Sequence, residues 1–248
     1  MRGRARVFYV NLFSPDLTDA DARRVLWTEL PTVSAGDRDW LELPLSLAEL
    51  SETLCRMPTN KSLGMDGLTV EFYGVFWDVP GPDLVVVWAE SLQSRVLPLS
   101  CSMDYKVVVK AISLWLGSVL ADVIHPDQTY TVPGRTIFEN LYLVRDLLEL
   151  GCWDGLSFAL LSLDQEKVFD RVDHVYLLGT LRAFGFRPHL SPGQLYALAI
   201  EPFLRLLRWR LTGLVLREPE LRLVLSAYAD DVLLVVQDPD DLVWVEAF

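Results

Sequence analysis

Cysteine is scarce in this sequence: Cys55, Cys101 and Cys152 are the only three among 248 residues, and they are widely spaced. The sequence contains no Cys-x-x-Cys pair and no cluster of cysteine with histidine. Three isolated cysteines argue against a disulfide framework and against a structural zinc site. They favour a reducing, intracellular compartment.

Basic residues and long hydrophobic runs are also lacking. The chain has 22 Lys and Arg against 34 Asp and Glu, a formal charge of −12. The overall field of such a chain does not steer it toward phosphate backbones, so nucleic-acid binding would need local basic strips or metal ions. No apolar run reaches the ~18 to 20 residues of a membrane span, and we expect no membrane partner. The 51% hydrophobic fraction suffices for a substantial core in one large or two small domains.

Helix signals are clear in the middle of the chain. Capping boxes at residues 46–49 and 136–139 predict two helix starts, with stops at Pro58 and at Gly151. The expected apolar faces carry Leu47, Leu50 and Leu54 in the first helix and Leu141, Val144 and Leu148 in the second. Apolar residues spaced i, i+3 and i+4 over 108–120 predict a buried helix. Two further helix starts are expected, at Asp173 and at residues 191–194.

Strand signals follow in the second half. The apolar run 156–163 is short and flanked by polar residues, which predicts a strand buried on both faces. Apolar residues 221–227 and 232–236 enclose the acidic turn 228–231 and predict a β-hairpin. The combination predicts an α+β protein with a sheet covered on one side.

Three carboxylates stand beside these strands. Asp164 follows the first strand, and Asp230 and Asp231 lie in the hairpin turn, 66 residues further on (230 − 164). If the strands pair side by side, the carboxylates meet at one sheet edge and form a site for two hard divalent cations. Two such ions about 3.5 to 4 Å apart can activate an attacking hydroxyl and stabilise a leaving pyrophosphate. Each acidic motif alone is better explained as a solvated turn or strand end.

Several motifs together resemble a known family. Residues 162–170 (SLDQEKVFD) with 228–231 (YADD) resemble the catalytic core of a reverse transcriptase of the non-LTR, LINE-type retrotransposon branch. Residues 61–67 (KSLGMDG) resemble the K-S-P-G-x-D-G element of that branch, and residues 127–135 with the following Asn140 resemble another of its elements. Residues 194–202 are similar to the palm helix after its Q-G-x-P-L-S element. The matches are collinear and span most of the chain.

The resemblance implies a right-hand polymerase that makes DNA on an RNA template. Its α+β fold would have fingers and a palm with an antiparallel sheet covered by helices. Residues 1–45 would be a connector or a poorly packed segment, 46–150 a fingers-like helical region, and 151–248 a palm-like region without a thumb. The expected partners are an RNA template, a DNA primer and deoxynucleoside triphosphates, in the nucleus or the cytoplasm.

The resemblance also assigns the metal ligands. Asp164 matches the first metal-binding aspartate, with the backbone carbonyl of Gln165 beside it. Asp230 matches the second metal ligand, and Asp231 its less directly coordinating neighbour. The catalytic residues would thus be Asp164, Asp230 and Asp231, holding two Mg²⁺ ions for which Mn²⁺ is a possible substitute.

Substrate contacts are implied at four more positions. Phe169 matches the aromatic gate that selects deoxynucleotides, although it could equally be a core aromatic, and Gln194 is a second candidate nucleotide contact. Arg135 could bind phosphate, because a guanidinium presents a fixed fork of donors, or be an exposed arginine at a helix start. Lys61 could touch the template or simply be solvated.

The chain departs from the family pattern in several places. Leu63 replaces a preferred proline, and Val168 a preferred alanine. A basic fingers segment is missing between residues 100 and 104, and the segment with the Q-G element is missing between residues 190 and 191. Arg205, Arg208 and Arg210 form a compact basic cluster that could bind nucleic acid.

Three hypotheses follow. The chain could be an internally truncated reverse transcriptase with weak or no activity, because polymerase catalysis depends on accurate positioning. It could instead be a non-catalytic retroelement remnant, acting as a binding or interaction module or without function. An unrelated α+β metal-dependent phosphotransferase with a chance acidic hairpin is the third.

Overall fold

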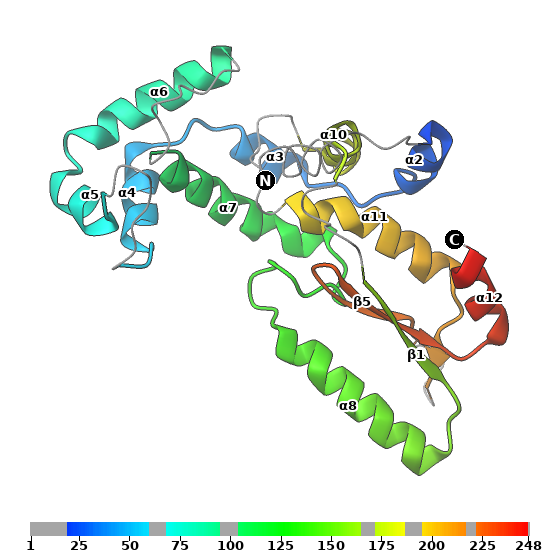
Figure 1. Ribbon diagram of the computed structural model, residues 1–248. Helices are drawn as coiled ribbons and strands as arrows, with labels where there is room; N and C mark the ends of the chain where they lie inside the picture. Colours follow the sequence, from blue (N-terminus) through cyan, green and yellow to red (C-terminus); the bar gives the residue numbers. More distant parts are fainter. Residues whose placement is uncertain are drawn as a thin grey trace, which may run out of the picture. The chain divides into compact units, whose positions relative to one another are not determined.

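A computed structural model describes residues 19–59, 68–94, 104–164, 172–186, 195–216 and 222–247 (Figure 1). These residues form ten helices and two small antiparallel sheets, which confirms the α+β class. No helix among them is both long and apolar enough to cross a membrane. The helices are α2 (Ala20–Leu26), α3 (Ala35–Leu41), α4 (Leu47–Cys55), α5 (Val70–Phe76), α6 (Pro80–Ser94), α7 (Asp104–Val123), α8 (Ile137–Asp154), α10 (His174–Ala183), α11 (Leu195–Arg210) and α12 (Pro239–Ala247).

The chain divides into two compact units. One contains Met1–Val33, Leu120–Phe186 and Gln194–Phe248, and the other contains Ser34–Val119 and Arg187–Gly193. Both candidate acidic motifs belong to the first unit. The expected fingers-like region 46–150 and palm-like region 151–248 are polymerase subdomains, which a division into compact units does not test. They stay a prediction.

The second unit is helical, and its local signals behave as predicted. Helix α4 begins at the expected capping box, in which the Ser46 hydroxyl accepts from the amide of Glu49 (3.3 Å) and the amide of Ser46 donates to the Glu49 carboxylate (2.9 Å). Leu50 and Leu54 face the core as the spacing predicts, whereas Leu47, expected on the same face, is 40% exposed. The helix expected over 108–120 is α7, and its apolar face is buried.

Two helices form within the stretch expected to be a connector. Asp19 caps α2 and Ser34 caps α3. The indole of Trp27, just after α2, donates to the hydroxyl of Thr180 on α10 (2.9 Å) and stacks on the ring of Tyr176, with a centroid distance of 6.0 Å. Helix α2 is therefore anchored to α10 by one aromatic side chain.

Gly179 makes room for this anchor, and its replacement tests the anchor directly. A Cβ at Gly179 would lie 2.3 Å from two atoms of the Trp27 ring. We expect Gly179→Ala to lower the free energy of unfolding by about 1–3 kcal/mol, the usual cost of overpacking. Thermal denaturation measures the effect. The control is Gly74→Ala in α5, where nothing lies within 4 Å of the new methyl group; there, a gain of about 0.5–1 kcal/mol is expected. Equal effects at the two sites would contradict the packing argument.

Helix α8 differs from its prediction in length and in orientation. It begins at the predicted capping box but passes Gly151 and ends at Gly155, whose φ of 64° is the left-handed conformation that glycine tolerates best. Leu147 packs in the core, whereas Leu141 and Leu148 are more than half exposed. The face of α8 predicted to be buried, which carries Leu141 and Leu148, therefore differs from the face that is buried, which carries Leu147.

The main sheet has the strand order β1-β5-β4, all antiparallel. The predicted hairpin is confirmed as β4 (Leu225–Tyr228) and β5 (Asp231–Val236). β1 (Ala159–Leu163) is an edge strand with exposed positions, so the prediction of a strand buried on both faces is wrong. A second sheet pairs β2 (Leu214–Val215) with β3 (Arg222–Leu223).

Helices cover both faces of the main sheet, which corrects the expectation of one covered face. Val232, Leu234 and Val236 pack in a cluster with residues of α11. Val235, which alternates to the opposite face, packs with Leu147 of α8. Figure 1 shows α11 and α8 on opposite sides of the strands. The acidic turn therefore projects from a sheet that is packed between two helices.

Candidate functional site: an acidic sheet edge and its polar support

The strand register brings the predicted acidic positions to one end of the sheet. Leu163, the last residue of β1, pairs with Val232, and Tyr228 pairs with Asp231 across the hairpin. Asp164 follows Leu163 directly, so the register continued by one residue would set it opposite Asp231. The register therefore places Asp164 and Asp230, 66 positions apart in the sequence (230 − 164), at the same end of the sheet. Their catalytic and metal-binding roles stay predictions.

The donor chemistry of this edge suits a hard cation, although it is not a closed metal cage. Within the described ranges, no three His, Cys, Asp or Glu side chains gather closely enough to hold a metal ion. Mg²⁺ is usually held by one or two carboxylates together with substrate phosphates rather than by an all-protein cage. Carboxylates on two adjacent strands meet that requirement. Asp164, Asp230 and Asp231 are the residues that would hold the ion.

The hairpin turn is strained at Ala229. This residue has a φ of 55° and a buried side chain. A left-handed conformation costs an L-residue other than glycine roughly 1–2 kcal/mol, and two-residue hairpin loops favour glycine at such a position. Strain of this kind persists when the surroundings hold the backbone in place. Burial and the nearby carboxylate of Asp230 together raise the pKa of Tyr196 in α11.

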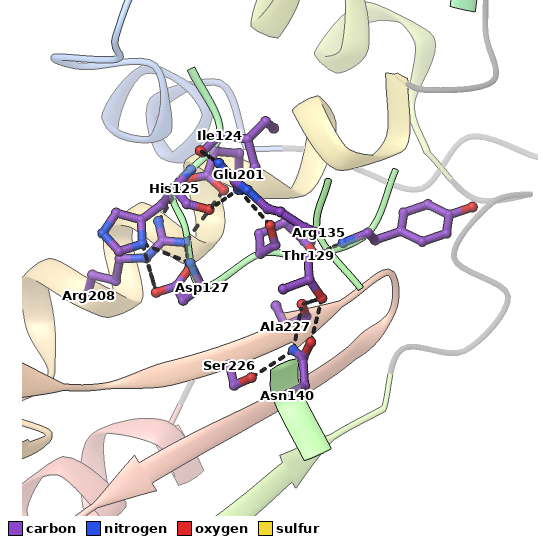
Figure 2. Close-up of polar contacts among 12 residues, drawn as sticks. Ile124, His125, Asp127, Thr129, Arg135, Asn140, Glu201, Arg208, Ser226 and Ala227 are labelled. Carbon is purple, nitrogen blue, oxygen red and sulfur yellow. Dashed lines mark hydrogen bonds and ion pairs between the residues drawn. The ribbon is translucent and has the colours of Figure 1, made fainter. Parts of the chain in front are cut away.

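Four of the predicted site residues lie outside the described residues: Lys61, Gln165, Phe169 and Gln194. Arg135 is described, and its guanidinium is engaged with the backbone. It donates to the carbonyls of His125 (2.7 Å), Gln128 (2.8 Å) and Ile124 (3.2 Å), which closes the loop after α7 (Figure 2). Its predicted contact with phosphate remains untested.

The basic cluster noted in α11 is divided by the structure. Arg208 donates to both carboxylate oxygens of Asp127 and to Glu201 (2.7 Å), and its side chain is only 11% exposed. Arg205 is exposed and makes no ion pair within the part of the chain described. Arg210 lies over the ring of Trp209, 4.7 Å from its centroid. Arg208 therefore serves the protein interior rather than a nucleic-acid surface.

One guanidinium shared by two carboxylates perturbs both. Burial raises the pKa of Glu201, and the attraction of Arg208 only partly offsets this. Burial acts in the same sense on Asp127, but hydrogen bonds from His125 and Arg208 outweigh it and lower the pKa of Asp127. The His125 ring nitrogen Nδ1 lies 3.0 Å from Asp127. Within the network the ionised form of Asp127 is therefore favoured, whereas burial disfavours the ionised form of Glu201.

This asymmetry predicts a pH dependence for Glu201→Gln. Because the folded state holds the Glu201 proton more tightly than the unfolded chain, the wild type loses stability as the pH rises through the raised pKa. Glutamine cannot titrate but still accepts a hydrogen bond from Arg208. We therefore expect the free energy of unfolding of Glu201→Gln, relative to wild type, to increase from acidic to neutral pH. Urea denaturation across this range measures it. A flat difference across this range would contradict the assignment.

A second set of hydrogen bonds reaches the hairpin from α8. The amide nitrogen of Asn140 donates to the Ser226 hydroxyl (2.7 Å) and to the carbonyl of Ala227 (3.1 Å), and its oxygen accepts from the hydroxyl of Thr129. The backbone of residues 127–129 forms a parallel bridge to Ala227. Figure 2 shows this chain of contacts from Arg208 to the strand that leads into the acidic turn.

A pocket of about 750 Å³ borders the ion network. Its wall includes Glu201 and Arg208, together with Leu26, Pro202, Arg205 and Trp209. The pocket lies between α2, the segment after α7, and α11, and the ion network forms part of its wall. All of these elements belong to the first compact unit.

Comparison with known proteins identifies a relative. No family model matches the chain. The chain is 51% identical to the transposon TX1 uncharacterized 149 kDa protein of Xenopus laevis, over an alignment that covers 98% of the chain. It spans 23% of the length of that relative. The alignment is 304 positions long against 248 residues in the chain, so at least 56 positions (304 − 248) hold residues that only the relative has. The chain is therefore a homologue of one segment of a transposon-encoded protein.

Proposed function

We propose that the chain is a segment of a retrotransposon reverse transcriptase of the LINE type, with a palm-like sheet and fingers-like helices. Its reaction would be RNA-directed DNA synthesis, and its activity alone would be weak or absent. The strand register supports the proposal most directly, because it sets Asp164 at the same sheet edge as Asp230 and Asp231. The homology to a transposon protein supports the retroelement origin.

In this proposal the acidic edge binds two divalent cations through Asp164 and Asp230, with Asp231 and the carbonyl of Gln165 beside them. When bound, Mg²⁺ activates the primer 3′-hydroxyl and stabilises the leaving pyrophosphate. The protein orients the carboxylates, and Phe169 and Gln194 contact the incoming deoxynucleotide. Lys61 and Arg135 contact the template or primer phosphates.

Low activity is part of the proposal, for two reasons. At least 56 positions of the relative have no counterpart in the chain, within the very stretch that matches. The expected sites of the two gaps, at residues 100–104 and 190–191, lie at or next to residues outside the described ranges. The acidic balance of −12 also leaves little basic surface to hold a nucleic acid. Loss of positioning groups costs polymerases orders of magnitude in rate.

Primer extension on an RNA template, with Mg²⁺ or Mn²⁺, tests the activity. We expect addition of at most a few nucleotides, and none from Asp230→Asn or Asp164→Asn. Asp240→Asn is the matched control, because Asp240 is an exposed carboxylate at the start of α12. Long products that Asp230→Asn abolishes would contradict the weak activity. Products unaffected by Asp164→Asn and Asp230→Asn would contradict the assignment of the site.

A second candidate function is a non-catalytic interaction module. Helix α8 exposes several large apolar side chains, which in a soluble monomer would be unfavourable over a wide area. They are Phe138, Leu141, Tyr142, Leu148 and Trp153. Absence of divalent-cation binding, together with self-association that Leu141→Lys relieves, would favour this function over the polymerase.

A further inference from the structure

The outer edge of the catalytic hairpin is held by a short segment far away in the sequence. The amide of Ala227 donates to the carbonyl of Asp127 (2.9 Å), and the amide of Thr129 donates to the carbonyl of Ala227 (3.0 Å). β4 is the last strand of its sheet. One of its edges pairs with β5, and residues 127–129 contact the opposite edge. Gln128 and Ala227, the bridge partners, are both fully buried. Two backbone hydrogen bonds therefore tie β4 to residues 127–129.

Residues 127–129 have no helix or strand of their own to hold them, and side chains do so instead. Arg135 bonds the carbonyl of Gln128, Asn140 bonds Thr129, and Arg208 holds Asp127. The Arg208 guanidinium grips the Asp127 carboxylate with its Nε (2.8 Å) and with a second nitrogen. Glu201, two turns earlier on α11 and only 3% exposed, fixes the same guanidinium. Bidentate pairs of this kind set orientation as well as distance. The position of residues 127–129 is thus fixed relative to α11, which packs on the sheet.

The hairpin turn begins two residues beyond Ala227. Ala229 holds a left-handed backbone conformation without being glycine. Such a conformation relaxes when the surrounding contacts loosen. Asp230 is the next residue, so relaxation at Ala229 would redirect its carboxylate.

We propose that Asp127 is a positioning residue: through Arg208 and the 127–129 segment it keeps the turn at Ala229 and Asp230 in its strained conformation. The consequence for metal binding rests on the proposed function, whereas the mechanical role does not. Asn140 supports the same strand from α8, through Ser226 and Ala227. The hairpin is thereby held by one polar anchor from α11 and one from α8.

Hydrogen–deuterium exchange tests the mechanical role in Asp127→Asn, which keeps the size of the side chain but removes its charge. We expect the amides of residues 228–232 to exchange at least about tenfold faster than in wild type, while those of α4, in the other compact unit, keep their rates. The matched control is Arg205→Gln, which removes an exposed charge one turn from Arg208 and should leave the hairpin rates unchanged. Faster exchange everywhere, or unchanged exchange at residues 228–232, would overturn the proposal.

Binding of Mn²⁺, followed by electron paramagnetic resonance at a temperature where all variants are folded, tests the consequence. We expect Asp127→Asn to weaken Mn²⁺ binding about three- to tenfold and Arg205→Gln to leave it unchanged. If wild type binds no Mn²⁺, the proposed function fails, and the exchange rates still decide the mechanical role. If Asp127→Asn frees the hairpin but binds Mn²⁺ as wild type does, positioning of the metal site is refuted.

Discussion

Replacement of Arg208 by methionine is expected to lower the free energy of unfolding by about 3–5 kcal/mol, the usual cost of removing one partner from a buried ion pair. Methionine preserves much of the apolar stem but leaves Asp127 with only His125 beside it and Glu201 without a guanidinium partner. Both carboxylates are largely buried, with side chains 18% and 4% exposed. Ionisation of Glu201 would then be uncompensated, which is why the loss should exceed that of an ordinary surface arginine.

Urea denaturation at neutral pH measures this effect. Arg205→Met is the matched control, since Arg205 lies on the same helix and is exposed; it should stay within about 0.5 kcal/mol of wild type. The deficit of Arg208→Met should shrink in acid, where the two carboxylates become protonated. Equal losses for the two arginines would show that the network contributes nothing beyond packing.

Replacement of Asp230 by asparagine is expected to weaken Mn²⁺ binding by at least about tenfold, because even loss of an outer-shell partner costs a metal site that much. In the absence of metal the same substitution should leave the melting temperature unchanged or higher. It removes one of three carboxylates at a sheet edge, where like charges repel one another. Opposite effects on metal affinity and on stability are the signature of a site kept for function rather than for folding.

Titration of Mn²⁺ and a thermal melt of the metal-free protein together measure the two effects. Asp240→Asn should leave both quantities as in wild type. A melting temperature that falls in Asp230→Asn with Mn²⁺ affinity intact would identify Asp230 as a turn-stabilising residue. It would remove the acidic edge as a candidate active site.

Local signals in the sequence predicted local structure well. The capping boxes at residues 46–49 and 136–139 start helices α4 and α8, because a cap satisfies orphan amides whatever the rest of the chain does. The acidic turn between two apolar runs forms the hairpin, and the apolar spacing over 108–120 forms α7. The expectation that these strands pair side by side is met, and the register places Asp164 at the end of the sheet that carries the hairpin turn.

Features that depend on tertiary contacts were not predicted. The apolar run before Asp164 was expected to be buried on both faces, but sequence alone does not show that β1 is at an edge. The end of α8 was misplaced, because Gly151 is tolerated inside the helix and Gly155 adopts the terminating conformation. Helices α2 and α3 were missed, although Asp19 and Ser34 are the residue types that cap helices.

The Arg208 network was missed for a different reason. Arg208 was grouped with neighbouring arginines as a basic cluster, although Glu201 stands seven residues before it on the same helix. Opposite charges two turns apart on a helix share a face, and in an otherwise apolar helix this pattern indicates a buried pair. The third member, Asp127, is 81 residues from Arg208, so only the fold could reveal it.

The two-sided grip on the hairpin has a consequence for motion. With Arg208 acting through residues 127–129 and Asn140 acting directly, the tip that carries Asp230 is clamped to helices above and below the strands. We expect a loop held in this way to move little when a reactant binds. Conformational changes during a reaction would then occur in other segments of the protein or in the bound molecules, and the hairpin would stay in place.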